Sequence, residues 1–245
     1  MTAGTIFYDR RKPPMLWFRA IWYVVNQKNG VSALRLQRIL GLKSYRTAWT
    51  WLHTLRCTMV RPGRDQLPGV VVEVDETYIG GKKPGKQGRG ATGKSLVVVA
   101  VEDKGEHFGR IRLSRVTDAS ATSLIPAVQK SVEKGSLVRT DGWSSYKQLS
   151  SKDYKHSVAR NSTDVGDNLF TLNKSSSCIA QKLAAGYSSR AVLPSHLDYY
   201  LDEFTFRFNR RTSLSRGKLF YRLVQQAVAI PPVTGQNIRG GREFL

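Results

Sequence analysis

The chain has 245 residues and a formal net charge of +21, from 39 Lys and Arg against 18 Asp and Glu. Its length suits one domain of about 150 residues and a smaller module, and its charge predicts a polyanionic partner, nucleic acid first. Two cysteines, Cys57 and Cys178, exclude a disulfide framework and an all-thiolate zinc site. Because no apolar stretch approaches the roughly 20 residues of a membrane span, we expect a cytoplasmic protein with no membrane partner.

The first part of the chain has the residue spacing of helices. Pro13 opens a segment of about fifteen residues that Gly30 closes. Ser32 then caps a short helix, and after a turn at Gly41 another helix runs over residues 43–55. Two short helices joined by a tight turn are typical of a DNA-binding helix-turn-helix, with an ordinary helical hairpin as the alternative. The DNA-contacting side chains would be those of Lys43, Ser44, Tyr45 and Arg46.

After residue 62 the pattern changes from helices to strands. Strands are predicted at residues 69–77, 95–102, 108–116 and 137–141, with a helix at 119–134 before the last of them. Three consecutive strands, a crossover helix and a fourth strand follow the ribonuclease H-like order, which sets the first and fourth strands side by side. We therefore predict an α/β protein: a small all-α helix-turn-helix module (1–62), a ribonuclease H-like mixed sheet with flanking and C-terminal helices (67–229), and a loose tail (230–245).

Asp75 and Asp141 each end an apolar, strand-like run. An acid on an aliphatic strand is costly unless it faces a counter-charge, and in so basic a protein the natural candidate is a divalent cation at a phosphodiester. Adjacent first and fourth strands would bring the two carboxylates together, so the pair predicts half of a metal-ion nuclease site. Taken singly, each acid is better explained as a strand-end or turn residue.

The segment from Gly80 to Lys94 is rich in glycine and lysine, including Lys82 and Lys83. Its cationic side chains could clamp the DNA backbone. A solvated loop is the alternative interpretation.

Three stretches resemble bacterial insertion-sequence transposases with the ISXO2-like catalytic domain, the IS1595 family. They are residues 74–82 (VDETYIGGK), 139–146 (RTDGWSSY) and 200–211 (YLDEFTFRFNRR), and the likeness continues upstream at 3–7, 30–34 and 45–49. The resemblance implies a DDE-type transposase that cleaves DNA at transposon ends and joins the 3′-hydroxyl to target DNA. It implies that Asp75 and Asp141 are catalytic and bind Mg²⁺ or Mn²⁺, two ions in an active enzyme. It also implies double-stranded DNA as the partner and a homodimer or larger assembly on that DNA.

The same family carries a Glu and two Arg at spacings that fall here on Glu203, Arg207 and Arg210. A 3.6-residue period puts the three on one helix face. The resemblance implies that they support the active site or contact DNA phosphates. A salt-bridged surface stripe is the alternative.

Two departures from the family pattern predict a damaged copy. Relatives carry an N-terminal zinc ribbon ahead of the first matching segment, so we expect an N-terminally truncated copy. The third metal ligand of relatives, a Glu, Asn or His on a helix, is not identifiable here. Residues 183–189 (LAAGYSS) can be encoded by bases that, read one nucleotide later, spell the family's WLLGTHQ, so we hypothesise a frameshifted stretch within residues 161–193.

Two other functions compete with an active transposase. The first is a degenerate, catalytically inactive copy that only binds DNA. The second is a basic RNA-binding protein, which gives no reason for acids at positions 75 and 141.

Overall fold

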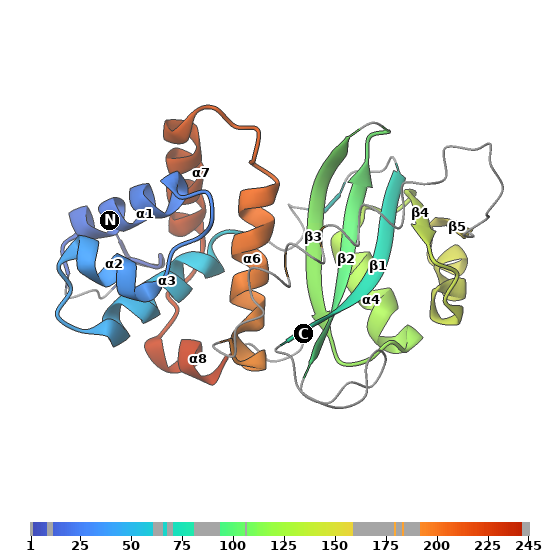
Figure 1. Cartoon of the computed structure of the whole chain (residues 1–245), viewed down its shortest axis with the longest axis horizontal. Helices are drawn as coiled ribbons and strands as arrows, with labels where there is room; N and C mark the ends of the chain where they lie inside the picture. Colours follow the sequence, from blue (N-terminus) through green and yellow to red (C-terminus); the bar gives the residue numbers. More distant parts are fainter. Residues whose placement is uncertain are drawn as a thin grey trace. The chain divides into compact units, whose positions relative to one another are not determined.

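The computed structural model describes residues 2–8, 12–60, 66–67, 71–80, 94–105, 107–158, 179, 183 and 192–241. The chain divides into two compact units (Figure 1). The helical unit comprises Met1–Arg61 and Tyr199–Glu243, and the sheet unit comprises Pro62–Asp198 with the last two residues. This division differs from the expected one, because the C-terminal helices join the N-terminal helices instead of the catalytic sheet. Among the described residues, no helix has the length and apolar character needed to cross a bilayer.

The predicted N-terminal helices are present as α1 (Pro14–Asn26), α2 (Ala33–Leu40) and α3 (Tyr45–Cys57). The hydroxyl of Ser32 caps α2 by accepting a hydrogen bond of 3.2 Å from the Arg35 N–H. Gly41 ends α2 at φ 61°, a left-handed conformation that glycine adopts without strain. The short turn between α2 and α3 therefore forms where the sequence predicted it.

The C-terminal helices are α6 (Leu197–Phe208), which follows a 3₁₀ turn, α7 (Arg216–Ala229) and α8 (Gly235–Gly240). Residues 230–241 thus differ from the expected loose tail. Thr234 caps α8 by accepting from the Asn237 N–H at 3.2 Å, and Ile238 is fully buried. Burial of one apolar side chain and a capped first turn hold this segment in place. Residues 242–245 lie outside the described part of the chain.

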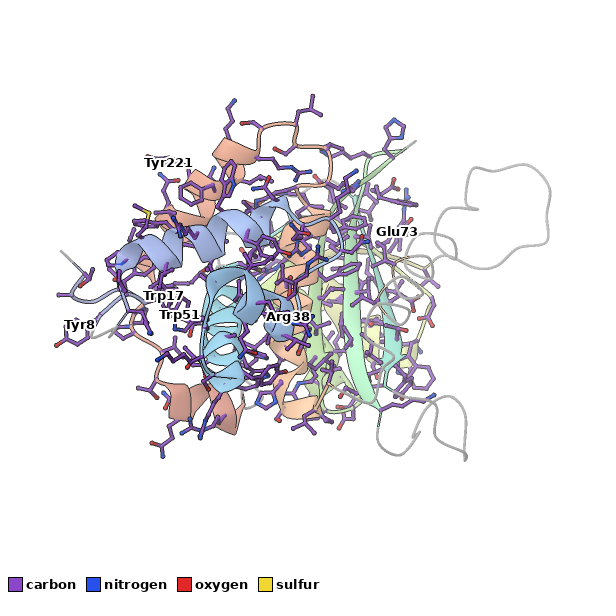
Figure 2. The ribbon with its side chains drawn as sticks, turned by 60° about the vertical axis from the view of Figure 1, so that its left-hand side comes forward. Tyr8, Trp17, Arg38, Trp51, Glu73 and Tyr221 are labelled. Atoms are coloured by element: carbon purple, nitrogen blue, oxygen red, sulfur yellow. The ribbon has the colours of Figure 1, made fainter. Side chains whose placement is uncertain are left out.

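The core of the helical unit is built around two tryptophans. The rings of Trp17 on α1 and Trp51 on α3 stack with centroids 4.0 Å apart, and Figure 2 labels both. α7 adds Leu219, Leu223 and Ala227 to the same core. Their four-residue spacing makes one apolar face, and burying that face is what brings α7 to the N-terminal helices.

The described residues of the sheet unit form a five-stranded sheet in the order β3-β2-β1-β4-β5. They are β1 (Val71–Ile79), β2 (Ser95–Asp103), β3 (Phe108–Val116), β4 (Leu137–Thr140) and β5 (Lys155–Val158), with α4 (Ala121–Ser131) as the crossover helix. β1 pairs antiparallel with β2 and parallel with β4, and β4 pairs parallel with β5. The ribonuclease H-like order and the β1–β4 adjacency are confirmed. β5 was not predicted, because its four residues are mostly exposed and carry no apolar run.

One face of the sheet packs on α4 (Figure 1). Val72 and Val74 of β1 share a core cluster with Leu124 and Val128 of α4 and with Val138 of β4. Alternate β1 residues therefore anchor the strand, and this packing fixes the stretch of β1 that carries Asp75 and Glu76.

Candidate metal centre

The structure brings Asp75 and Asp141 together. β1 and β4 run parallel, with Val71 opposite Leu137 and Glu73 opposite Arg139. Extending this register by two residues sets Asp75 beside Asp141, just past the end of β4. One carboxylate oxygen of each, together with one of Glu76, lies within 4.8 Å of the others. Among the described residues, these three acids form the group that could hold a metal ion.

Glu76 is a member of this cluster that sequence reasoning missed. Neighbouring residues on a strand point to opposite faces, so the acid after Asp75 was not expected at the same site. However, β1 pairs with β4 only as far as Glu73. Among the described residues, no strand pairs with this edge of β1 beyond that point, and the Glu76 carboxylate reaches the space next to Asp141. The adjacent acids Asp75 and Glu76 are the sequence feature that could have identified Glu76 as a member of the cluster.

Backbone hydrogen bonds orient both aspartates. Oδ1 of Asp75 accepts from the Glu76 N–H at 2.8 Å, and Oδ1 of Asp141 accepts from the Trp143 N–H at 3.0 Å. Between the last two residues, Gly142 has φ 83°, and a Cβ there would lie 2.6 Å from Cγ1 of Val158. Only glycine fits this turn without strain.

The segment after Asp141 is tied to the residue that precedes α4. Nε1 of Trp143 donates to the Ala119 carbonyl at 3.1 Å, and the Ser145 hydroxyl donates to the same oxygen at 2.8 Å. These two bonds hold the turn against the body of the sheet unit. The carboxylate of Asp141 is exposed, yet its backbone is anchored on both sides.

Tyr146 lies beside the acid cluster and is fully buried. Burial raises the pKa of its phenol, and the negative charges of Glu76, Asp75 and Asp141 raise it further. Its hydroxyl makes no hydrogen bond of standard geometry with the described residues. Tyr146 is therefore a neutral phenol with a proton to donate, next to three carboxylates.

Glu203 and Arg207 lie together in the helical unit. Nη2 of Arg207 donates to Oε1 of Glu203 at 2.6 Å, and Nε of Arg56 donates to Oε2 at 2.7 Å. Arg207 also donates to the carbonyls of Val24 and Gln27 at the end of α1. We call Arg56, Glu203 and Arg207 the buried ion cluster. Arg56 was not identified from the sequence, because 147 residues separate it from Glu203.

Electrostatics keep Glu203 ionised in this cluster. Burial acts to raise the pKa of its carboxyl, but the charges of Arg56 and Arg207 and their hydrogen bonds outweigh it, and the pKa is lowered. Arg210 contacts Phe206: its guanidinium lies 4.2 Å from the centre of the Phe206 ring and donates to the Phe206 carbonyl. Of the three residues that the family pattern grouped, Glu203 and Arg207 are in direct contact.

The predicted DNA-contacting residues of the helix-turn-helix are all exposed. Lys43, Ser44, Tyr45 and Arg46 occupy the turn before α3 and its first two positions. The side chain of Ser44 makes no capping hydrogen bond. Lys82 and Lys83 lie outside the described residues, as does nearly all of the stretch from 161 to 193 in which the frameshift was hypothesised.

Comparisons with known proteins identify one family. The model of the ISXO2-like transposase domain matches residues 66–209. No curated protein sequence matches the chain. Two crystal structures show a distant likeness: the Mos1 strand transfer complex, at 10% identity and a TM-score of 0.33, and a pre-cleavage Mos1 transpososome, at 14% and 0.29. Each likeness covers 97% of this chain and 82% of the other.

Proposed function

Because the chain belongs to the ISXO2-like transposase family, whose model covers more than half of it, we propose that it is a metal-dependent DDE-type enzyme. Its activity would be cleavage of DNA at the ends of an insertion sequence and transfer of the cut strand. The metal-binding residues would be Asp75, Glu76 and Asp141, with Glu76 as the third acid.

The observation that carries this proposal is the closeness of three carboxylates in a protein of net charge +21. Like charges within 4.8 Å repel one another, and a cation bound between them would relieve that repulsion. A set of oxygen donors alone suits Mg²⁺ or Mn²⁺ and does not favour zinc or copper. The donor set therefore fits the metal that the family implies.

A bound divalent ion would lower the pKa of an attacking water or 3′-hydroxyl and stabilise the leaving oxygen of the phosphodiester. The residues of the chain supply the geometry. Asp75 and Asp141 are oriented by backbone N–H groups, which fix the direction of each carboxylate. With a metal ion bound, Tyr146 would donate to Glu76, the carboxylate beside it, and so fix the direction of that ligand.

DNA recognition would fall to the helix-turn-helix, through Lys43, Ser44, Tyr45 and Arg46. Their exposure at the start of α3 supports contact with phosphates and base edges. Glu203 and Arg207 would support this function indirectly, because the buried ion cluster fixes α3 through Arg56. Lys82 and Lys83 remain proposed contacts with the DNA backbone, and a dimer or larger assembly on DNA remains proposed as well.

The test is cleavage of a labelled duplex that carries the terminal repeat of the element, in Mg²⁺ or Mn²⁺. Nicking should disappear in Asp75→Ala, Asp141→Asn and Glu76→Gln, and should persist in Glu133→Gln, an exposed Glu outside the cluster. Mn²⁺ binding, followed by calorimetry, should weaken in the same three variants. A band shift without nicking by the unmodified chain would favour the inactive DNA-binding copy. Full activity of Glu76→Gln would remove Glu76 from the site and leave the two aspartates.

A further inference from the structure

A hollow of about 530 Å³ opens in the helical unit where α6 passes into α7. Its lining includes three cationic side chains, those of Arg210, Lys218 and Arg222, and the hydroxyl residues Thr212, Ser213 and Tyr221. No acidic residue is among its lining residues. We call this hollow the α6–α7 groove.

The charge around the groove is not compensated by the local sequence. Residues 204–242 contain eight Arg or Lys and no Asp or Glu. Arg207 belongs to the buried ion cluster, and Arg211 lies 4.1 Å from the centre of the Phe208 ring. Lys218 and Arg222 are exposed and stand one helical turn apart on α7, so their charges project on one side of the helix.

The groove also presents an exposed aromatic ring and a fixed guanidinium. Tyr221 of α7, labelled in Figure 2, is 64% exposed. The guanidinium of Arg210 is held in place by its ring contact and its bond to Phe206. A rigid arginine, two exposed cations, hydroxyl groups and an exposed aromatic ring are the usual contacts of a protein with the sugar-phosphate backbone.

We propose that the α6–α7 groove is a second DNA-binding surface, which takes the phosphate backbone of duplex DNA through Arg210, Lys218 and Arg222. This surface is separate from the helix-turn-helix and from the acid cluster. It contacts phosphates and therefore adds affinity without sequence preference. The proposal rests on the proposed function only in that DNA is the partner.

The experiment measures DNA binding without catalysis. The full chain carrying Asp75→Asn is titrated, in EDTA, against labelled duplexes of terminal-repeat and scrambled sequence, and fluorescence anisotropy gives the affinity over a range of salt concentrations. The double variant Lys218→Gln/Arg222→Gln should bind both duplexes more weakly, by roughly tenfold per lost contact near 0.1 M salt. The slope of log affinity against log salt should fall by about 2. Lys12→Gln/Lys28→Gln, at two exposed lysines of the same unit, is the charge-matched control.

Gly217 offers a test that does not threaten folding. It lies in the first turn of α7 and lines the groove, and a Cβ there would meet nothing within 4 Å. Gly217→Glu favours the helix, because an acid at a helix N-terminus is stabilising, yet it puts a negative charge where the phosphate would lie. It should weaken binding, whereas Gly217→Ala should leave binding unchanged.

The outcomes separate the groove from the rest of the function. Equal affinities and salt slopes for the double variant and Lys12→Gln/Lys28→Gln would overturn the proposal. Failure of the parent chain to bind either duplex would instead reject DNA as the partner. A loss confined to the terminal-repeat sequence would assign the groove to base recognition and would also overturn it.

Discussion

Nε of Arg56 donates to Oε2 of Glu203 across 2.7 Å, and both side chains are almost completely buried. This bond joins α3 to α6. We predict that Glu203→Gln lowers the free energy of unfolding of the helical unit by about 3–5 kcal/mol, because removing one partner leaves buried guanidinium charge without compensation. Urea unfolding of the parent chain and the variant at pH 7 measures this change in free energy. Glu133→Gln, at an exposed site, should change stability by less than about 0.5 kcal/mol.

The buried ion cluster also predicts how stability varies with pH. The folded-state pKa of Glu203 is lowered from its ordinary value of 4.5, so the cluster contributes its full stability above that value and loses it as pH falls through the lowered pKa. The difference in unfolding free energy between the parent chain and Glu203→Gln should therefore be largest at neutral pH and shrink below about pH 4.5. A difference that stays constant down to pH 3 would mean that the carboxylate charge contributes nothing.

Tyr146→Phe should have opposite effects on folding and on metal binding. Without metal, the variant loses a buried hydroxyl that makes no standard hydrogen bond, so its stability in EDTA should be unchanged or slightly higher. Its affinity for Mn²⁺ should fall by about 10- to 100-fold, the usual cost of losing a residue that orients a ligand. Urea unfolding and calorimetry give the two quantities. If stability in EDTA and affinity for Mn²⁺ fell to the same extent, Tyr146 would contribute to packing only.

Gly142→Ala should disturb the position of Asp141. The new methyl group would meet Cγ1 of Val158 at 2.6 Å, at a residue whose φ of 83° already disfavours any side chain. The expected cost is about 1–3 kcal/mol in stability, together with weaker Mn²⁺ binding. Adding Val158→Ala removes the clash but not the backbone strain, so it should restore only part of the loss. Complete restoration would show that the left-handed conformation is not required.

The sequence was sufficient for the parts of the fold that depend on local pattern and topology. The run from Val71 to Val116 shows its three strands through apolar periodicity, and the crossover helix then implies that β1 and β4 are neighbours. The closeness of Asp75 and Asp141 follows from that adjacency. Glu76 could not be predicted in the same way. Neighbouring residues of a strand point to opposite faces, so the sequence argues against a site shared by Asp75 and Glu76. The two acids can share a site because the pairing of β1 with β4 stops at Glu73.

Packing partners far apart in the chain were harder to predict. The apolar face of α7, at Leu219 and Leu223, indicates that another part of the protein must cover the helix. The pattern does not say which apolar surface that is. For the same reason the partnership of Arg56 with Glu203 could not be read from either segment alone. The basic α6–α7 groove depends on two helix ends meeting, and no pattern within one helix reports this.

The parallel pairing of β1 with β4 has a consequence during synthesis. A parallel neighbour cannot be reached by a tight hairpin, so β1 meets β4 only after the second strand, the third strand and α4 have been made. A nascent chain that ends before residue 141 contains Asp75 and Glu76 but no Asp141, and it cannot assemble the acid cluster. The order of the strands thus withholds the complete acid cluster from unfinished chains, and a ribosome that stalls earlier releases a chain in which Asp75 and Glu76 lack their third carboxylate.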